Sequence, residues 1–142
     1  MPTIKSDMKI VFATIMSIIE YFFGGFDTGM STLIAFMIVD VITGFIKAYL
    51  GKSEKSSRGD LDSEIMWKGG VKKGVVFIVI YVSAMTCRLL TPESTLIRDF
   101  TVTYYAISEA LSILENAVAC GISVPEPLKQ ILDKSLDSSK NS

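Results

Sequence analysis

The chain has 142 residues, of which 49% are hydrophobic, with a mean hydropathy of +0.44 and a formal net charge of −1. The absence of histidine excludes Ser-His-Asp and Cys-His nucleophile arrangements and histidine-based zinc sites, and the charge balance gives no basic field for nucleic acid. Two cysteines, Cys87 and Cys120, make no disulfide framework. We therefore expect one membrane domain over residues 1–142, without cofactor, metal site or enzyme activity.

The first apolar segment, Ile10–Phe26, follows Lys5 and Lys9 and contains Glu20. Its length of about 17 residues is at the lower limit for crossing about 30 Å of hydrocarbon. It lacks the small-residue cleavage site of a signal peptide, so we expect it to be retained as a helix. If it only lies on the membrane surface, three spans remain instead of four.

Three further segments are long enough to cross a bilayer as helices. They are Met30–Leu50, Val71–Leu90 and Phe100–Cys120. The segment Val71–Leu90 is rich in β-branched residues, but lipid does not tolerate open strand edges, so a helix is favoured there too. The sequence thus predicts an all-α polytopic membrane protein with transmembrane helices at about 10–26, 30–50, 71–90 and 100–120.

Polar stretches separate these segments. Residues 51–70 are expected to form a cytoplasmic loop that holds Trp67 near the membrane, and Pro92 stops the third helix within a short turn. Gly121 is a helix stop that opens a C-terminal tail over 121–142. Apolar residues at helical spacing predict a short amphipathic helix in this tail: Leu128, Ile131, Leu132 and Leu136.

Basic residues decide the predicted orientation. Four spans with both termini in the cytoplasm place 12 lysines and arginines inside and only Arg88 and Arg98 outside, whereas three spans give a split of 10 to 4. The positive-inside rule therefore favours the four-span topology with cytoplasmic termini. The inside residues are Lys5, Lys9, Lys47, Lys52, Lys55, Arg58, Lys68, Lys72, Lys73, Lys129, Lys134 and Lys140.

Three of the four predicted helices carry a stripe of polar and small residues. The candidates for helix contact or pore lining are Glu20 on the first helix, Asp40, Thr43, Gly44 and Lys47 on the second, and Glu109, Ser112, Glu115 and Asn116 on the fourth.

In this topology Lys47 and Glu115 lie in the same half of the membrane and could pair. Glu20, Asp40 and Glu109 have no deep cationic partner. A charge at bilayer depth costs roughly 2.5 to 3.5 kcal/mol on insertion scales, so these acids must be protonated, hydrogen-bonded or hydrated. The stripes either hold the bundle together or line water in an assembled state, where a narrow acidic lumen would favour cations.

The glycine-rich segment at 69–74 lacks the residue order of a phosphate-binding loop and leads directly into an apolar helix. We interpret it as a membrane entry whose lysines, Lys72 and Lys73, extend toward the interface. Val71–Leu90 is the most uniformly apolar helix and is expected to face lipid.

Four sequence elements follow one another in a recognisable order. They are D-V-I-T-G at 40–44, S-S-R-G at 56–59, G-G-V-K-K at 69–73 and E-A-L-S-I-L-E-N-A-V-A-C-G-I-S-V-P-E-P-L at 109–128. Over roughly residues 28–135 the chain thereby resembles the toxin-secretion/phage-lysis holin family, which includes phage holins of Gram-positive hosts and the clostridial toxin-export holin. Asp40, Gly44, Glu115, Asn116 and Pro125 match recurring positions of that family.

The resemblance implies a homo-oligomer that sits among the lipids of the bacterial cytoplasmic membrane and forms lesions or pores during host cell lysis. It implies a functional link, without required direct contact, to a released endolysin or toxin. Some holins use a second start codon, and Met8 is either such a start or a coincidental methionine. The alternatives are a non-enzymatic anchor or structural subunit for a soluble partner, and a small ion channel or transporter.

Overall fold

The computed structural model describes residues 4–52 and 63–140, and all regular structure in these two ranges is α-helical. The all-α prediction is therefore confirmed for the described part of the chain. Lys55, Arg58 and the S-S-R-G element at 56–59 lie outside the described residues. The helices are α1 (Ile4–Phe23), α2 (Thr28–Tyr49), α3 (Ser63–Leu90), α4 (Leu96–Ala119) and α5 (Glu126–Lys140).

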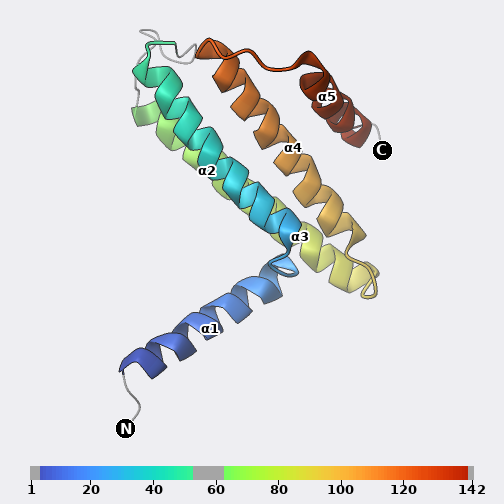
Figure 1. Cartoon of the computed structure of the whole chain (residues 1–142). Helices are drawn as coiled ribbons and strands as arrows, with labels where there is room; N and C mark the ends of the chain where they lie inside the picture. Colours follow the sequence, from blue (N-terminus) through green and yellow to red (C-terminus); the bar gives the residue numbers. More distant parts are fainter. Residues whose placement is uncertain (1–3, 53–62, 141–142) are drawn as a thin grey trace.

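The central helix of the structure is α4. It packs against α2 over most of its length and also contacts α3 and α5 (Figure 1). In contrast, α1 leaves the bundle where α2 begins and points away from it, and its last turn packs against α3. The structure is therefore a three-helix bundle of α2, α3 and α4 with an external helix at each end of the chain.

Glycine allows α2 to approach α4 closely. A Cβ atom on Gly29 would lie 3.4 Å from Cγ1 of Val102, and one on Gly44 would lie 3.8 Å from Nδ2 of Asn116. Small residues at such a seam bring two membrane helices within van der Waals contact. Between these two glycines, the buried apolar cluster of the bundle joins three helices: Met30, Leu33 and Met37 of α2, Ile80 of α3 and Val102 of α4.

Two helix boundaries differ from the sequence prediction. Residues 63–70, expected as loop, form the first two turns of α3, and α1 begins at Ile4 rather than near residue 10. Two glycines cost about 1 kcal/mol each in a helix interior, which is too little to end a helix that continues on both sides. The predicted stop at Gly121 is confirmed, because this residue follows α4 with a φ of +86°.

Two helices of the described residues, α2 and α3, are long and apolar enough to cross a membrane by length and composition. α1 and α4 each carry four charged residues along their length. The count of four transmembrane helices therefore remains a prediction.

The expectation that the third helix is uniformly apolar and faces lipid is wrong for one of its faces. Ile80, Ser83, Ala84 and Cys87 are buried against the rest of the bundle. The opposite face of α3 is exposed, with Val71, Val75, Ile78 and Val82 on it.

Candidate functional site

A lysine joins three helices inside the bundle. Lys73 of α3 places Nζ 3.0 Å from Oδ2 of Asp40 on α2, and the same atom pairs with Oε2 of Glu109 on α4. The three side chains are 20%, 16% and 14% exposed, so they are largely removed from solvent. One ammonium group thus links two carboxylates that come from different helices.

Asparagine completes the contact between α2 and α4. Nδ2 of the buried Asn116 donates to Oδ1 of Asp40 at 3.1 Å and to Oγ1 of Thr43 at 3.2 Å. The Thr43 hydroxyl in turn donates to the backbone carbonyl of Asp40 at 3.1 Å. The absence of a side chain on Gly44 leaves room for the Asn116 amide. We call Asp40, Thr43, Lys73, Glu109 and Asn116 the three-helix polar cluster.

The structure therefore brings together five of the nine predicted site residues. Asp40, Thr43, Gly44, Glu109 and Asn116 meet at one level of the bundle.

The other four predicted residues lie outside this cluster. Glu20 on α1 and Glu115 on α4 are exposed, while Lys47 and Ser112 are half-buried. Within the described ranges, no ion pair joins Lys47 to Glu115, so the suggested pairing is not present.

Lys73 corrects two statements made from the sequence. Asp40 and Glu109 do have a deep cationic partner, and this lysine turns into the bundle instead of extending toward the interface. Its position on α3 carried the signal, because Lys73, Ile80 and Cys87 recur every seven residues and share the buried face. The adjacent Lys72 lies on another side of the helix and is exposed.

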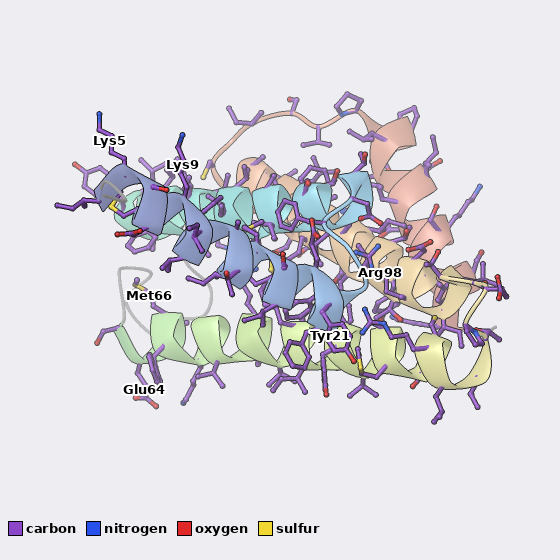
Figure 2. The ribbon with its side chains drawn as sticks, turned by 90° about the horizontal axis from the view of Figure 1, so that it is seen from below. Lys5, Lys9, Tyr21, Glu64, Met66 and Arg98 are labelled. Atoms are coloured by element: carbon purple, nitrogen blue, oxygen red, sulfur yellow. The ribbon has the colours of Figure 1, made fainter. Side chains whose placement is uncertain are left out.

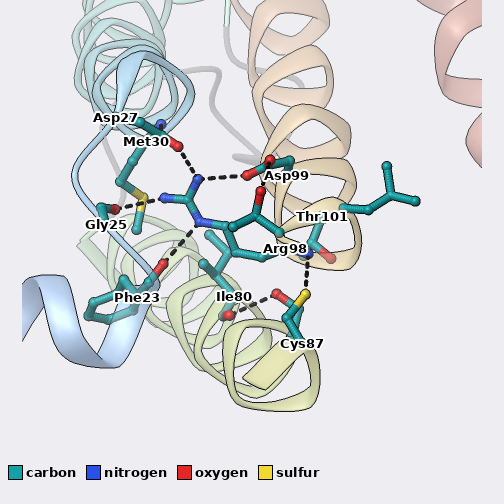
Figure 3. Close-up of polar contacts among 12 residues, drawn as sticks. Phe23, Gly25, Asp27, Met30, Ile80, Cys87, Arg98, Asp99 and Thr101 are labelled. Carbon is teal, nitrogen blue, oxygen red and sulfur yellow. Dashed lines mark hydrogen bonds and ion pairs between the residues drawn. The ribbon is translucent and has the colours of Figure 1, made fainter. Parts of the chain in front are cut away.

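A second buried cation closes the other end of the bundle. Arg98, at the start of α4, is 2% exposed, and its guanidinium contacts the segment that connects α1 to α2 (Figure 3). Nε donates to the carbonyl of Phe23 at 3.0 Å and Nη2 to the carbonyl of Gly25 at 2.8 Å. Nη1 pairs with Asp27 and with Oδ1 of Asp99, the latter at 2.9 Å. We call this group the arginine clamp.

The clamp serves both helices that meet at the connecting segment. The carbonyl of Phe23, the last residue of α1, has no partner within the helix, and Arg98 supplies a donor to it and to the carbonyl of Gly25 in the connecting segment. Asp27 is the N-cap of α2, and its Oδ1 accepts the backbone N–H of Met30 at 3.0 Å. Burial opposes ionisation of Asp27, but the bonds from Met30 and Arg98 outweigh it and lower the pKa of this carboxyl below its usual value.

The sequence indicated Arg98 only as one of two basic residues on the outer side. Its position two residues before Phe100, where the predicted helix begins, gave no sign that the α1–α2 connection folds over it. The neighbouring Asp99 accepts both from Arg98 and from the hydroxyl of Thr95, at 2.6 Å for the latter. The adjacent opposite charges of Arg98 and Asp99 were visible in the sequence, but they did not identify Asp27 as a second acidic partner of Arg98.

The described residues contain no group of three or more His, Cys, Asp or Glu side chains placed to hold a metal ion. The carboxylates of the three-helix polar cluster are instead paired with Lys73, and those of the arginine clamp with Arg98. What this arrangement can do is hold helices together through polar contacts that are strong because they lie away from water. The same contacts, once broken, leave groups that must find new partners.

Comparison with known proteins identifies a family. The family model described as the bacteriophage holin family matches residues 17–137. The chain is 34% identical over 140 residues to an uncharacterized 14.9 kDa protein in the nagH 3′ region of Clostridium perfringens. The aligned residues make up 99% of this chain and 100% of that protein. An uncharacterized protein of Clostridium acetobutylicum is 32% identical over 126 residues, 89% of this chain and 95% of its own length. No solved structure matches the chain.

Proposed function

The chain belongs to the bacteriophage holin family, and we propose that it oligomerises in the bacterial cytoplasmic membrane into lesions or pores that release an endolysin or a toxin during host cell lysis. The observation that carries this proposal is the three-helix polar cluster inside a bundle whose outer surface is apolar. Such a chain is stable in lipid as a closed unit and also contains polar groups that can contact other copies.

The polar side chains of the cluster can find partners in two ways, within one chain or between neighbouring chains. Within one chain, Lys73 and Asn116 occupy the carboxylates of Asp40 and Glu109. When copies crowd in the membrane, the same polar faces of α2 and α4 can turn toward neighbouring chains or toward a shared water-filled opening. Because the carboxylates outnumber the ammonium group in the cluster, a lumen lined by it would favour cations.

The proposed topology follows from the basic residues and the helices together. α2, α3 and α4 cross the membrane, α1 supplies the fourth span, and both termini are cytoplasmic. The link to an endolysin or toxin is functional, since a lesion releases either without binding it. Self-association and contact with membrane lipids are the only direct interactions that the proposal requires.

Removal of either carboxylate of the cluster should change lysis timing. We expect Asp40→Leu or Glu109→Leu to delay or abolish lysis without preventing membrane insertion, because each change leaves Lys73 with one partner and alters the polar face of its helix. The time from induction to loss of optical density is the measurement, with membrane fractionation as the insertion check. Glu115→Leu is the matched control, since this glutamate is exposed on α4 and outside the cluster. Unchanged timing in both cluster variants would remove the assigned role.

The proposed function is tested by membrane potential and viability after induced expression in a bacterium, with and without a co-expressed endolysin. Abrupt depolarisation at a reproducible time, with lysis only when the endolysin is present, supports a holin. Intact potential at high levels of membrane-inserted protein would contradict lesion formation. It would favour an anchoring subunit for a soluble partner, which a pull-down with residues 51–73 would then identify.

A further inference from the structure

One face of α3 carries a continuous stripe that is occupied over only half its length. The stripe residues follow one another at intervals of three and four: Gly70, Gly74, Phe77, Tyr81, Ala84 and Arg88. The C-terminal part of the stripe, from Phe77 to Arg88, contacts the last turn of α1. Ring centroids of Phe22 and Tyr81 lie 5.5 Å apart, and those of Phe23 and Phe77 lie 5.9 Å apart.

Two further contacts belong to the same half of the stripe. The guanidinium carbon of Arg88 lies 4.2 Å from the ring centroid of Tyr21, which points toward α3 while Lys5 and Lys9 point away from it (Figure 2). A Cβ atom on Gly24 would lie 3.4 Å from Cβ of Ala84. The end of α1 thus lies on α3 along about three turns, from Phe77 to Arg88.

The N-terminal part of the stripe, at Gly70 and Gly74, has no neighbour from another helix among the described residues. Apart from the neighbouring backbone of α3 itself, no atom of the described residues lies within 4 Å of a Cβ built on Gly70 or Gly74. The two glycines form a G-x-x-x-G pair, which lets a second membrane helix approach the backbone closely. The Phe22–Tyr81 contact shows which helix already uses this face.

α1 carries a complementary stripe. Its members recur with the same spacing as those on α3 and are all exposed: Ile4, Met8, Val11, Ile15, Ile18 and Phe22. No residue of α1 is buried, and the exposed fraction falls from 81% at Ile4 to 40% at Phe22, where the helix meets α3. A twenty-residue apolar helix is therefore in contact with its own bundle only at one end.

The two stripes match when they are aligned from their existing contact. Starting at Phe22 opposite Tyr81, the next pairs toward both N-termini are Ile18 with Phe77, where Ile18 replaces Phe23, then Ile15 with Gly74 and Val11 with Gly70. The two largest gaps in α3 thus receive two β-branched side chains. In the proposed topology α1 and α3 both run from the cytoplasmic to the outer side, so the alignment is parallel, as the pairing requires.

We propose that α1 is a strap that closes along the α3 stripe of its own chain, pivoting at Gly24 and Gly25 about the Phe22–Tyr81 contact, to complete a four-helix form. This inference rests on the proposed function only in placing α1 and α3 across the membrane. We assign the helix that covers the stripe to the same chain for two reasons. The contacts at residues 21–24 already hold α1 on this face of α3, and the connection between α1 and α2 is short, residues 24–27. Both pivot glycines have positive φ, +74° and +116°.

The arginine clamp opposes this closure. Carbonyls at a helix C-terminus point along the helix axis, so Arg98, which binds the carbonyl of Phe23 and also that of Gly25 in the connection, holds the axis of α1 toward the start of α4. Laying α1 along α3 turns these carbonyls away from the guanidinium. The clamp and the glycine stripe therefore favour two different positions of α1.

A disulfide pair tests the closed position in the full-length chain in membranes. Cys120→Ala removes the more accessible native thiol, buried Cys87 is kept, and Ile15→Cys is combined with Gly74→Cys. Under mild oxidation we expect an intrachain disulfide, read as monomer that no longer accepts a maleimide-polyethylene glycol label at these positions. The matched controls are Ala13→Cys with Gly74→Cys and Ile15→Cys with Gly69→Cys, which move one cysteine to another face of its helix.

The results separate the alternatives. An intrachain disulfide about tenfold above both controls supports the strap, and adding Arg98→Met should increase its rate of formation. A disulfide found only in covalent dimers would assign the stripe to α1 of a second copy, and no excess over the controls would leave α1 to lipid, so either overturns the proposal. Cross-linking without depolarisation of expressing cells would contradict the holin function but leave the strap intact. Lysis without cross-linking would contradict the strap but leave the holin function intact.

Discussion

Replacement of Lys73 by methionine is expected to be among the most damaging single changes in this chain. It leaves the carboxylates of Asp40 and Glu109 facing each other in a largely buried site with no cation between them. Breaking a buried ion pair by removing one partner costs about 3 to 5 kcal/mol, and the partial exposure of this site places the expected loss near the lower end, about 3 kcal/mol. We expect the purified protein to lose helical packing at a lower denaturant concentration and the expressed protein to lose lysis activity.

Lys72→Met is the matched control for this prediction. It removes the same charge one residue earlier, from an exposed position on α3, and should leave stability within about 0.5 kcal/mol of the unchanged chain. Both variants are compared by denaturant titration in detergent micelles, followed by circular dichroism. Equal stability of the two would show that the three-helix polar cluster does not hold the bundle.

Compensation offers a second check of the same cluster. Adding Asp40→Asn and Glu109→Gln to Lys73→Met removes the two carboxylate charges that the lysine contacts. The triple variant should recover much of the lost stability, because the buried groups are then neutral and Asn116 can still donate to residue 40. A triple variant as unstable as Lys73→Met alone would assign the effect to lost packing of the lysine side chain.

Replacement of Arg98 by methionine is expected to have an effect of similar size. The change removes the donors to the carbonyls of Phe23 and Gly25 and the partner of Asp27, all held by a side chain that is 2% exposed. About 3 kcal/mol of stability should be lost, since several charge-assisted hydrogen bonds disappear together. Thermal unfolding in detergent would measure the loss.

Arg88→Met provides the control for the clamp. This arginine is exposed and stacks on the ring of Tyr21, an interaction worth about 0.5 to 1 kcal/mol at an exposed site. The two arginines lie on the same side of the membrane in the proposed topology, so a general charge effect would change both variants alike. A loss of stability in Arg88→Met as large as that in Arg98→Met would contradict the special role of the clamp.

Periodicity predicted the helices and much of the polar cluster. Asp40, Thr43 and Gly44 lie on one face of α2, and Asn116 shares an arc with Glu109 on α4, so a 3.6-residue period was enough to place each set on one face of its helix. Their contacts with each other followed because polar groups in an apolar helix must find partners. Glu20, Lys47, Ser112 and Glu115 have the same spacing but lie outside the cluster, since spacing alone does not fix the level at which two helices exchange polar contacts.

Lys73 and Arg98 were not predicted because their partners come from distant parts of the chain. A lysine near the end of an apolar segment usually extends to the interface, and only the inward rotation of α3 toward α2 and α4 overrides that preference. The clamp depends on backbone carbonyls of residues 23 and 25, which no side-chain pattern records. Both cases are tertiary effects on residues whose local sequence indicated an ordinary position.

The contact between α2 and α4 also has a consequence for how the protein is made. A ribosome that has completed α2 must add residues 50–95 before α4 begins to appear, which at about 5 to 20 residues per second takes roughly 2 to 9 s. During that interval α2 exists without the helix that covers most of its length, and Asp40 has neither Asn116 nor Glu109 beside it. Formation of the early helices and completion of the bundle are therefore separate events, and α4, the last of the three bundle helices to be synthesised, is the one that joins them.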